Sequence, residues 1–530
     1  EKPYKREGAG LTLAALYTEE ENFSTDSLYR LIELAAGGLD QYQSDSVQNL
    51  LQEFDHFYLA NRLYMLNLAG IYTTGFECPD STRIIPELRQ MMEGMLSVYQ
   101  QFNSGYSSRK LPADYLLLYN KAVVFVKRQP EAYSSFDHFT FIRDYINPLF
   151  SLNQQLINRY GVVSQSFNDY SLNNTAPSIF SKQLFTGQQA KGVFFRVKDP
   201  AALAAIDRLG KMLFYDPVLS GNNKRSCASC HRPGQFFTDT VNATSVQYNG
   251  RDQLSRNTPT LVNVLYNHLL MQDGSIISLQ EQCKAVITNP LEMGGHEKEA
   301  LEKILSCPDY KKGFQQLLSF LPLKKEVDMD MVVSAITWYY SKFSHYYSPF
   351  DEAMNKKAPV GTDVKKGFNL FMGKAQCGTC HFVPQFNGVK PPYIGSEFEV
   401  LGVPADTAFH QLSNDVGRYQ VNPAPEALHA FRTGTVRNIS LTGPYMHNGV
   451  FRSLEEVISF YNNGGGAGRK LTVANQTLSN DSLHLTRQEI IQLVSFMKSL
   501  TEKLVVDLPP SRLPASSIKN LNNRKPVGEY

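Results

Sequence analysis

Apolar residues recur at intervals of three and four positions over much of the first 160 residues. The segments Asp45 to Ala69 and Tyr115 to Val126 show this spacing, which is the period of an amphipathic helix. The pattern predicts a succession of helices from about residue 8 to 160 that pack as a bundle. A polar stretch rich in turn-forming residues, Ser164 to Pro177, follows and predicts a linker. The first domain boundary is therefore expected between residues 160 and 195.

Helical patterns resume at Pro200, and two of them share a short repeat. Gly210 to Phe214 reads GKMLF, Gly367 to Phe371 reads GFNLF, and each segment precedes a pair of cysteines. An Arg-Asn dipeptide follows each pair, at Arg256 and at Arg437. The repeat predicts two related modules in tandem behind the bundle, in an all-α fold. The expected divisions are an accessory domain with its linker, two modules and a C-terminal tail, at residues 1–190, 191–355, 356–510 and 511–530.

Four of the seven cysteines form two copies of C-x-x-C-H, the attachment site of a c-type haem. Two thiols at this spacing add to the two vinyl groups on one edge of the porphyrin, and the next residue places its imidazole under the iron. A thioredoxin-like dithiol or a four-cysteine zinc site would leave the histidine after each pair unexplained. The sequence thus predicts two covalently bound haems c, with the sites Cys227-Ala-Ser-Cys230-His231 and Cys377-Gly-Thr-Cys380-His381 and the proximal iron ligands His231 and His381.

Composition and charge exclude some classes of partner and location. The 530 residues carry a formal net charge of +2, whereas a nucleic-acid binder is typically strongly basic. No run of apolar residues approaches the length of about 18 that a membrane span needs. Covalent haem attachment takes place outside the cytoplasm, so a periplasmic location is expected, with or without an anchor in a removed N-terminal segment. Cys78, Cys283 and Cys307 remain, an odd number that permits at most one internal disulfide.

The two haem sites lie in an ordered series of shorter motifs that resembles the bacterial di-haem cytochrome c peroxidases, a family that also includes MauG. The resemblance spans roughly residues 195 to 505 and leaves the first 190 outside it, where Phe136 to Tyr145 faintly resembles imelysin-like helical domains. The motifs that carry it are LFYDPVLS at 213–220, RNTPTLVN at 256–263, QDG at 272–274, LQEQ at 279–282, LEM at 291–293 and TGPYMHNG at 442–449.

The resemblance implies a peroxidase whose first haem reduces hydrogen peroxide and whose second accepts electrons from a small cytochrome c or a copper protein. Cleaving the O–O bond needs a group that takes a proton from one oxygen and returns it to the other. Glu292 matches the family's acid-base residue, and Gln282 matches its hydrogen-bonding partner. Two alternatives stay open: a MauG-like oxidase that acts on a protein or organic substrate, and a non-catalytic multihaem electron carrier. Family members are often dimers, so a homodimer is one assembly that the resemblance allows.

Two departures from the family bear on the first haem. Many members ligate the resting peroxidatic iron with a histidine about sixteen residues past the first haem motif, but residues 232–267 contain none. The resemblance therefore predicts a five-coordinate iron that needs no reductive activation, and His268 is expected to be structural. Gln272 stands where the family usually has a tryptophan relay between the haems, and the only tryptophan, Trp338, is expected in the core. Transfer between the haems would then use backbone, propionates or a tyrosine such as Tyr266.

The sixth ligand of the second iron is Met in the usual peroxidases and Tyr in the MauG-like branch. The matching position here is Tyr461, and Met446 is the competing candidate. A methionine ligand would raise the reduction potential, whereas a tyrosinate would lower it.

The resemblance also implies a calcium ion between the haems, held by the Asn257 side chain and the backbone carbonyls of Thr442 and Pro444, since oxygen ligands suit a hard cation. Arg256 and Arg437 are expected to pair with haem propionates, because guanidinium binds carboxylates bidentately. In the N-terminal domain, Asp137 and His138 could form a metal pair, but among phenylalanines they more often form a satisfied core pair.

Overall fold

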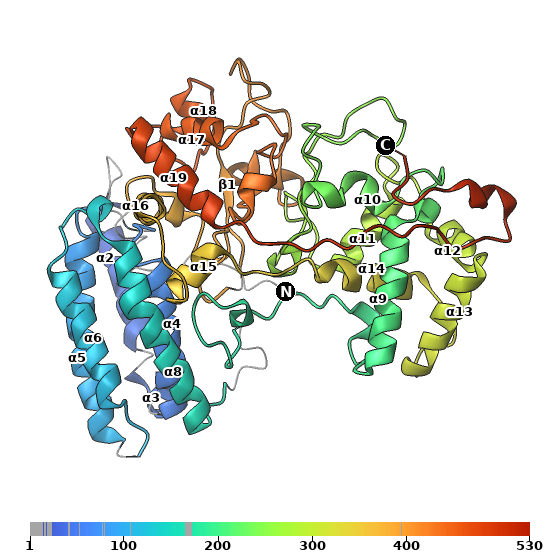
Figure 1. Cartoon of the computed structure of the whole chain (residues 1–530). Helices are drawn as coiled ribbons and strands as arrows, with labels where there is room; N and C mark the ends of the chain where they lie inside the picture. The colour runs from blue at the N-terminus through green and yellow to red at the C-terminus, as the bar shows by residue number, and fades with distance from the viewer. Residues whose placement is uncertain are drawn as a thin grey trace.

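The computed structural model describes residues 14, 17–18, 24–40, 43–51, 53–76, 78, 80–106, 108–164, 172–393 and 395–529. Over these ranges the chain is mostly helical, as the predicted all-α fold requires, while the bundle and the tandem arrangement of the two modules remain predictions (Figure 1). The described residues contain a single sheet, in which β1 (Phe398–Val400) pairs antiparallel with β2 (Ala430–Arg432). None of the helices in the described ranges is both long enough and apolar enough to cross a membrane.

The long N-terminal helices lie side by side in Figure 1. The segment from Asp45 to Ala69 forms two helices rather than one, and the apolar pattern from Tyr115 to Val126 lies inside α6. The π-helical turn Phe141–Ile146 leads into the last of these helices. The N-terminal helices are α2 (Thr25–Asp40), α3 (Asp45–Leu51), α4 (Phe54–Gly70), α5 (Ile84–Gly105), α6 (Ala113–Lys127), α7 (His138–Thr140) and α8 (Asn147–Tyr160).

The repeated glycine has a packing role in both copies. Gly210 in α9 faces α14, and a Cβ atom on it would lie 2.0 Å from the carbonyl oxygen of Ala335. Gly367 in α16 faces α19 in the same way, 2.0 Å from the carbonyl oxygen of Gln492. Only glycine permits these helix pairs to cross so closely. The helices of this half of the chain are α9 (Pro200–Tyr215), α10 (Cys227–Cys230), α11 (Leu279–Thr288), α12 (Glu297–Leu305), α13 (Pro308–Leu317), α14 (Met329–Ser341), α15 (Pro349–Met354), α16 (Thr362–Met372), α17 (Leu454–Asn462), α18 (Gly465–Gly468) and α19 (Arg487–Ser499).

The buried apolar side chains form two cores. One contains residues between Ala190 and Phe343, and these surround the first cysteine pair. The other joins residues 58–185 to residues 346–500. Within this second core, where residues 58–185 meet residues 346–500, Phe139 packs edge-on against Phe368. The backbone N–H of Phe139 also donates to Asn369 Oδ1 at 2.8 Å. The N-terminal helices therefore pack on the module of the second cysteine pair, while the domain boundaries themselves remain a prediction.

A buried carboxylate lies where the two modules meet. Glu502 is 3% exposed, and its Oε1 accepts hydrogen bonds from the side-chain amides of Asn263 and Asn438. Asn438 is the asparagine of the second Arg-Asn dipeptide, and Asn263 lies six residues after the asparagine of the first. Both have a left-handed backbone with φ of 62°. The other oxygen of Glu502 accepts the backbone N–H of Tyr346 at 2.7 Å. One carboxylate thus ties together both modules and the segment that connects them.

The C-terminal tail returns to the first module, as its dark red trace in Figure 1 shows. The carbonyl oxygen of Val527 accepts hydrogen bonds at 2.7 Å from the hydroxyls of Ser226, which precedes the first cysteine pair, and of Ser229, which lies between the two cysteines. Arg524 forms a buried ion pair with Asp216 at 2.7 Å. The tail thereby fixes the short helix α10 from its outer side.

Candidate active site

The first haem motif occupies the helical turn α10 and the residue after it. A capping box between Ser226 and Ser229 begins the turn, and Cys227 and Cys230 lie at its two ends. The Nδ1 atom of His231 lies 3.1 Å from the carbonyl oxygen of Phe237, so Nδ1 carries the proton and Nε2 keeps its lone pair. Burial lowers the pKa of His231, which keeps the imidazole neutral at neutral pH. This is the form that ligates a metal.

A cavity of about 860 Å³ opens above this turn. Its walls include both thiols of the motif and the His231 ring, and the second module adds Asp415, Val416 and Arg432. All seven cysteines are free thiols, and Cys283 and Cys307 are buried. Two free thiols and a neutral imidazole at the rim of one large, mostly apolar cavity fit a covalently bound haem c, with Cys227 and Cys230 as the attachment points and His231 as the proximal ligand.

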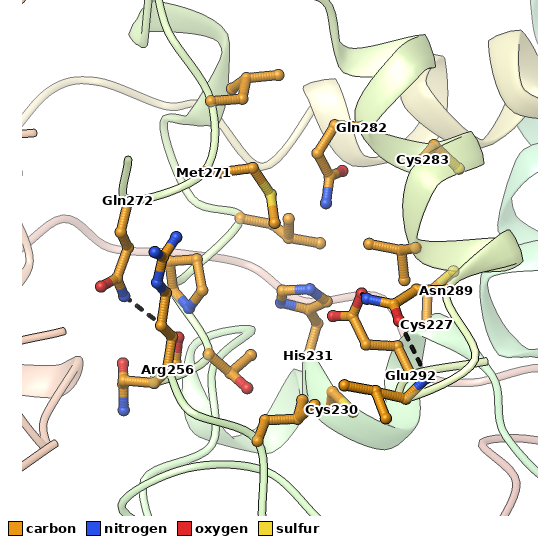
Figure 2. A pocket seen from close by; sticks show the side chains of 18 of the residues that line it. Cys227, Cys230, His231, Arg256, Met271, Gln272, Gln282, Cys283, Asn289 and Glu292 are labelled. Atoms are coloured by element: carbon orange, nitrogen blue, oxygen red, sulfur yellow. Dashed lines mark hydrogen bonds between the residues drawn. The ribbon is translucent and has the colours of Figure 1, made fainter. Parts of the chain in front are cut away.

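Gln282 and Glu292 both line this cavity, as Figure 2 shows. Gln282 projects from α11, and Glu292 lies in the turn that follows the helix, where its backbone N–H donates to the carbonyl oxygen of Asn289 at 3.1 Å. The side-chain amide of Asn289 donates to Glu292 Oε2 at 2.8 Å. Burial raises the pKa of the Glu292 carboxyl, and the Asn289 hydrogen bond opposes part of the rise. The structure thus brings the two predicted residues together beside His231.

His231 is the only histidine among the residues that line this cavity. Two thioethers, those of Met271 and Met293, also belong to its walls, and Figure 2 shows the Met271 side chain beside Gln282. The sequence pattern did not single out either methionine. Gln272, at the position of the family's tryptophan, donates from Nε2 to the carbonyl oxygen of Asn257 at 3.3 Å, and its buried Oε1 has no hydrogen-bond partner among the residues that the structure describes.

The second haem motif begins in the 3₁₀ turn Cys377–Thr379 and repeats the geometry of the first. His381 Nδ1 lies 3.2 Å from the carbonyl oxygen of Phe386, and burial lowers the pKa of its imidazole to about 4. Tyr461 lies on α17. Burial raises the pKa of its phenol, and the nearby thiols of Cys380 and Cys377 add to the rise, which places the phenol close to the attachment site.

Met446, the competing ligand, lies in the turn between Tyr445 and Phe451 with a left-handed backbone, φ 69°. The choice between Tyr461 and Met446 as the sixth ligand remains a prediction.

The two arginines expected to meet propionates already have protein partners. Arg256 donates to Asp415 at 2.6 and 2.9 Å and to Asp273 at 2.6 Å. Burial works to raise the pKa of Asp273, yet hydrogen bonds from Arg256 and Ser275 hold it below its usual value. Arg437 is 1% exposed and pairs bidentately with Asp351 at 2.8 Å. Whether either guanidinium also reaches a propionate remains a prediction.

The predicted calcium ligands lie on segments that meet. The backbone N–H of Asn257 donates to the carbonyl oxygen of His447 at 2.6 Å, a few residues after Thr442 and Pro444. Over the described ranges no group of three or more His, Cys, Asp or Glu could hold a metal ion, but the predicted set consists of amide and carbonyl oxygens. Calcium therefore stays a prediction.

Asp137 and His138 do not point at a shared ligand. Asp137 accepts hydrogen bonds from Thr140 and from Asn369, and pairs with Lys365 at 3.1 Å. His138 is fully buried against Phe136, and burial lowers its pKa to about 3. Both residues lie at the contact between the N-terminal helices and the second module, as a core interpretation predicted. They do not form the expected satisfied pair, because Asp137 binds Thr140, Asn369 and Lys365, and the ring nitrogens of His138 have no hydrogen-bond partner among the described residues.

Comparison with known proteins agrees with this geometry. A model of the di-haem cytochrome c peroxidase family matches residues 204–359. The chain is 32% identical over 335 residues to the cytochrome-c peroxidase IdrP1 of Pseudomonas sp. (strain SCT), which covers 59% of this chain and 85% of the relative. It is 31% identical over 312 residues to the cytochrome c551 peroxidase of Nitrosomonas europaea, covering 59% and 83%. It is 29% identical over 309 residues to the methylamine utilization protein MauG of Methylorubrum extorquens, covering 57% and 80%.

Proposed function

The chain belongs to the di-haem cytochrome c peroxidase family of oxidoreductases, and from that premise we propose that it reduces hydrogen peroxide to water in the cavity above His231. The reaction takes up two electrons and two protons for each peroxide and releases two waters. The observation that carries the proposal is the placement of Glu292 and Gln282 in the wall of the cavity that also holds His231. Neither Glu292 nor Gln282 lies near His231 in the sequence.

The protein's own groups handle the protons and the position of the substrate. Two haems, which the two cysteine pairs and their histidines would hold, would supply the iron that binds peroxide and the electrons that reduce it. The Glu292 carboxylate takes the proton from the near peroxide oxygen and returns it to the departing one. The Gln282 amide hydrogen-bonds the bound peroxide and orients it. Asn289 holds the Glu292 carboxyl in place at 2.8 Å.

The pH dependence of turnover follows from the state of Glu292. Only the ionised carboxylate accepts a proton, and burial raises the pKa of this group above its ordinary 4.5. The second-order rate constant for peroxide is therefore expected to be constant at high pH and to fall as the pH drops through the raised pKa. Stopped-flow mixing of the holoprotein with peroxide at a series of pH values measures it. A profile with no acid limb above pH 4.5 would remove Glu292 as the base.

Tyr461 is the proposed sixth ligand of the second haem, because its phenol lies close to Cys380 and Cys377. Replacing Tyr461 by Met is expected to raise the midpoint potential of that haem, since a thioether favours ferrous iron more than a phenolate does. Spectroelectrochemical titration measures the potential of each haem. If Tyr461→Met leaves both potentials unchanged while Met446→Leu shifts the second one, Met446 is the ligand.

One relative with a different named role is MauG, and a MauG-like oxidase is the second candidate function. Tyr461 favours it, because a tyrosine at this position marks that branch. Gln272 opposes it, because an amide side chain cannot be oxidised to relay charge between the haems. A non-catalytic electron carrier is opposed by the acid-base pair in the cavity, which electron transfer alone does not need.

Steady-state turnover with hydrogen peroxide and a reduced small cytochrome c tests the proposal. We expect peroxide-dependent oxidation of the donor by the holoprotein. Absence of turnover with cytochrome and copper-protein donors alike, together with peroxide-dependent oxidation of an organic substrate, would favour the oxidase. The periplasm is the proposed location, since haem is attached covalently there, and calcium bound by Asn257, Thr442 and Pro444 is proposed as a structural ion between the modules.

A further inference from the structure

Arg432 is a cation without an anion in the wall of the first haem cavity. It ends strand β2 of the second module, and its backbone N–H donates to the carbonyl oxygen of Gln272 at 2.8 Å. The guanidinium donates from Nη1 to Asn267 Oδ1 at 3.2 Å and from Nε to the carbonyl oxygen of Met271 at 3.4 Å. Both acceptors are neutral. Within the part of the chain that the structure describes, Arg432 takes part in no ion pair, although burial lowers its pKa to about 10.

Arg256 and Arg437 differ from Arg432 in this respect, because both face carboxylates. Arg256 pairs with the carboxylates of Asp273 and Asp415, so these three side chains together carry a net charge of −1. Arg437 is neutralised by Asp351. A buried charge is costly unless it is paired. Arg432 therefore marks a place in the cavity where a negative group would offset a buried charge, and none of the residues that the structure describes supplies one there.

We propose that Arg432 binds a propionate of the first haem. Thioether bonds to Cys227 and Cys230 would hold the vinyl edge of the porphyrin, so its propionate edge would lie on the opposite side of the cavity. Figure 2 shows Gln272 and Arg256 across the cavity from Cys227, and Arg432 is hydrogen-bonded to the backbone of Gln272. Guanidinium and carboxylate form strong, charge-assisted hydrogen bonds. The ion pair would link a haem attached to the first module with a strand of the second.

This pairing has two electrostatic consequences. A cation near the porphyrin favours the ferrous state, which carries one positive charge fewer, and so raises the potential of the first haem. It also keeps the propionate ionised, because a nearby opposite charge lowers a carboxyl pKa. Arg432 is thus a positioning residue of the first haem. The inference rests on the proposed function only in requiring that a haem is attached at Cys227 and Cys230.

The test uses the haem-loaded full chain and the variants Arg432→Gln and Arg432→Lys. The midpoint potential of the His231 haem is measured by spectroelectrochemistry from pH 5 to 8, and the propionate bending band by resonance Raman. In the unchanged protein the propionate should stay ionised throughout this range, so any pH dependence of the potential should come from Glu292. Arg432→Gln should lower the potential, add a pH dependence from the propionate and shift the Raman band, whereas Arg432→Lys should preserve most of the potential. Arg418→Gln is the matched control, since Arg418 donates to the carbonyl oxygens of Asp273 and Gly274 and does not line the cavity.

The proposal is overturned if Arg432→Gln leaves the first haem's potential, its pH dependence and the Raman band unchanged, or if only the second haem responds. If Arg432→Gln does not accumulate haem, the unchanged protein provides the test instead. A propionate of the first haem that titrates between pH 5 and 8 in that protein would contradict the pairing. Peroxide turnover is measured separately. A protein that lacks turnover but shows the Arg432 effect would contradict the proposed function and leave this inference standing.

Discussion

Replacing Glu292 by Gln is expected to lower the second-order rate constant for hydrogen peroxide by about 10²- to 10⁴-fold, the range of a lost general acid-base group. The amide keeps the size of the side chain and its contact with Asn289 but cannot take up a proton. Haem content and the spectrum of the resting protein should stay unchanged, because Glu292 lies in the cavity wall and not at an attachment point. Stopped-flow mixing with peroxide measures the effect.

Glu281→Gln is the matched control for this experiment. Glu281 is exposed and lies one residue before Gln282, outside the cavity wall. Its replacement should leave the rate within twofold of the unchanged protein. If Glu292→Gln also retained the full rate, Glu292 would not be the acid-base residue, and the proton would have to travel by another route.

Replacing Arg437 by Ala is expected to lower the free energy of unfolding by about 3–5 kcal/mol, the cost of leaving a buried carboxylate without its partner. The side chains of Arg437 and Asp351 are 0% and 1% exposed. Arg437 also donates to the carbonyl oxygen of Pro384, three residues after His381, at 2.7 Å. The loss should therefore destabilise the second haem module. Urea unfolding followed by far-UV circular dichroism measures it.

Two further variants serve as controls for that experiment. Arg83→Ala breaks an exposed ion pair with Glu87, whose side chains are 54% and 59% exposed, and should cost no more than about 1 kcal/mol. Arg437→Met combined with Asp351→Leu removes both charges and should recover much of the loss. A single Arg437→Ala variant as stable as Arg83→Ala would show that the pair contributes little to the fold.

The sequence predicted the parts of the site whose chemistry requires adjacent residues. Both haem motifs are contiguous because two thioether bonds and one axial ligand must reach a single porphyrin. The repeated glycines, Gly210 and Gly367, also carried information, since each permits a close helix crossing that recurs in both modules. Gln282 and Glu292 came from resemblance, and the structure supplies what resemblance lacks, namely a shared cavity and the raised pKa of Glu292.

The contacts that the sequence did not predict join residues far apart in the chain. The partner of Arg437 is Asp351, 86 residues away, where the pattern suggested a propionate. Glu502 joins Asn263 and Asn438 across both modules, and no local spacing marks it. Arg432 belongs to one module and lines the cavity of the other. Such pairings depend on tertiary packing, and a single sequence carries no period or motif for them.

The central claim is that the His231 haem is open at rest and reacts with peroxide beside Glu292 without prior reduction. Mixing the fully oxidised holoprotein with one equivalent of hydrogen peroxide, followed by electron paramagnetic resonance of samples frozen at increasing times, tests this directly. We predict a high-spin ferric signal from the first haem that disappears on mixing. A first haem that is low-spin at rest, with a side chain such as Met271 as sixth ligand, and that reacts only after reduction, would contradict the account.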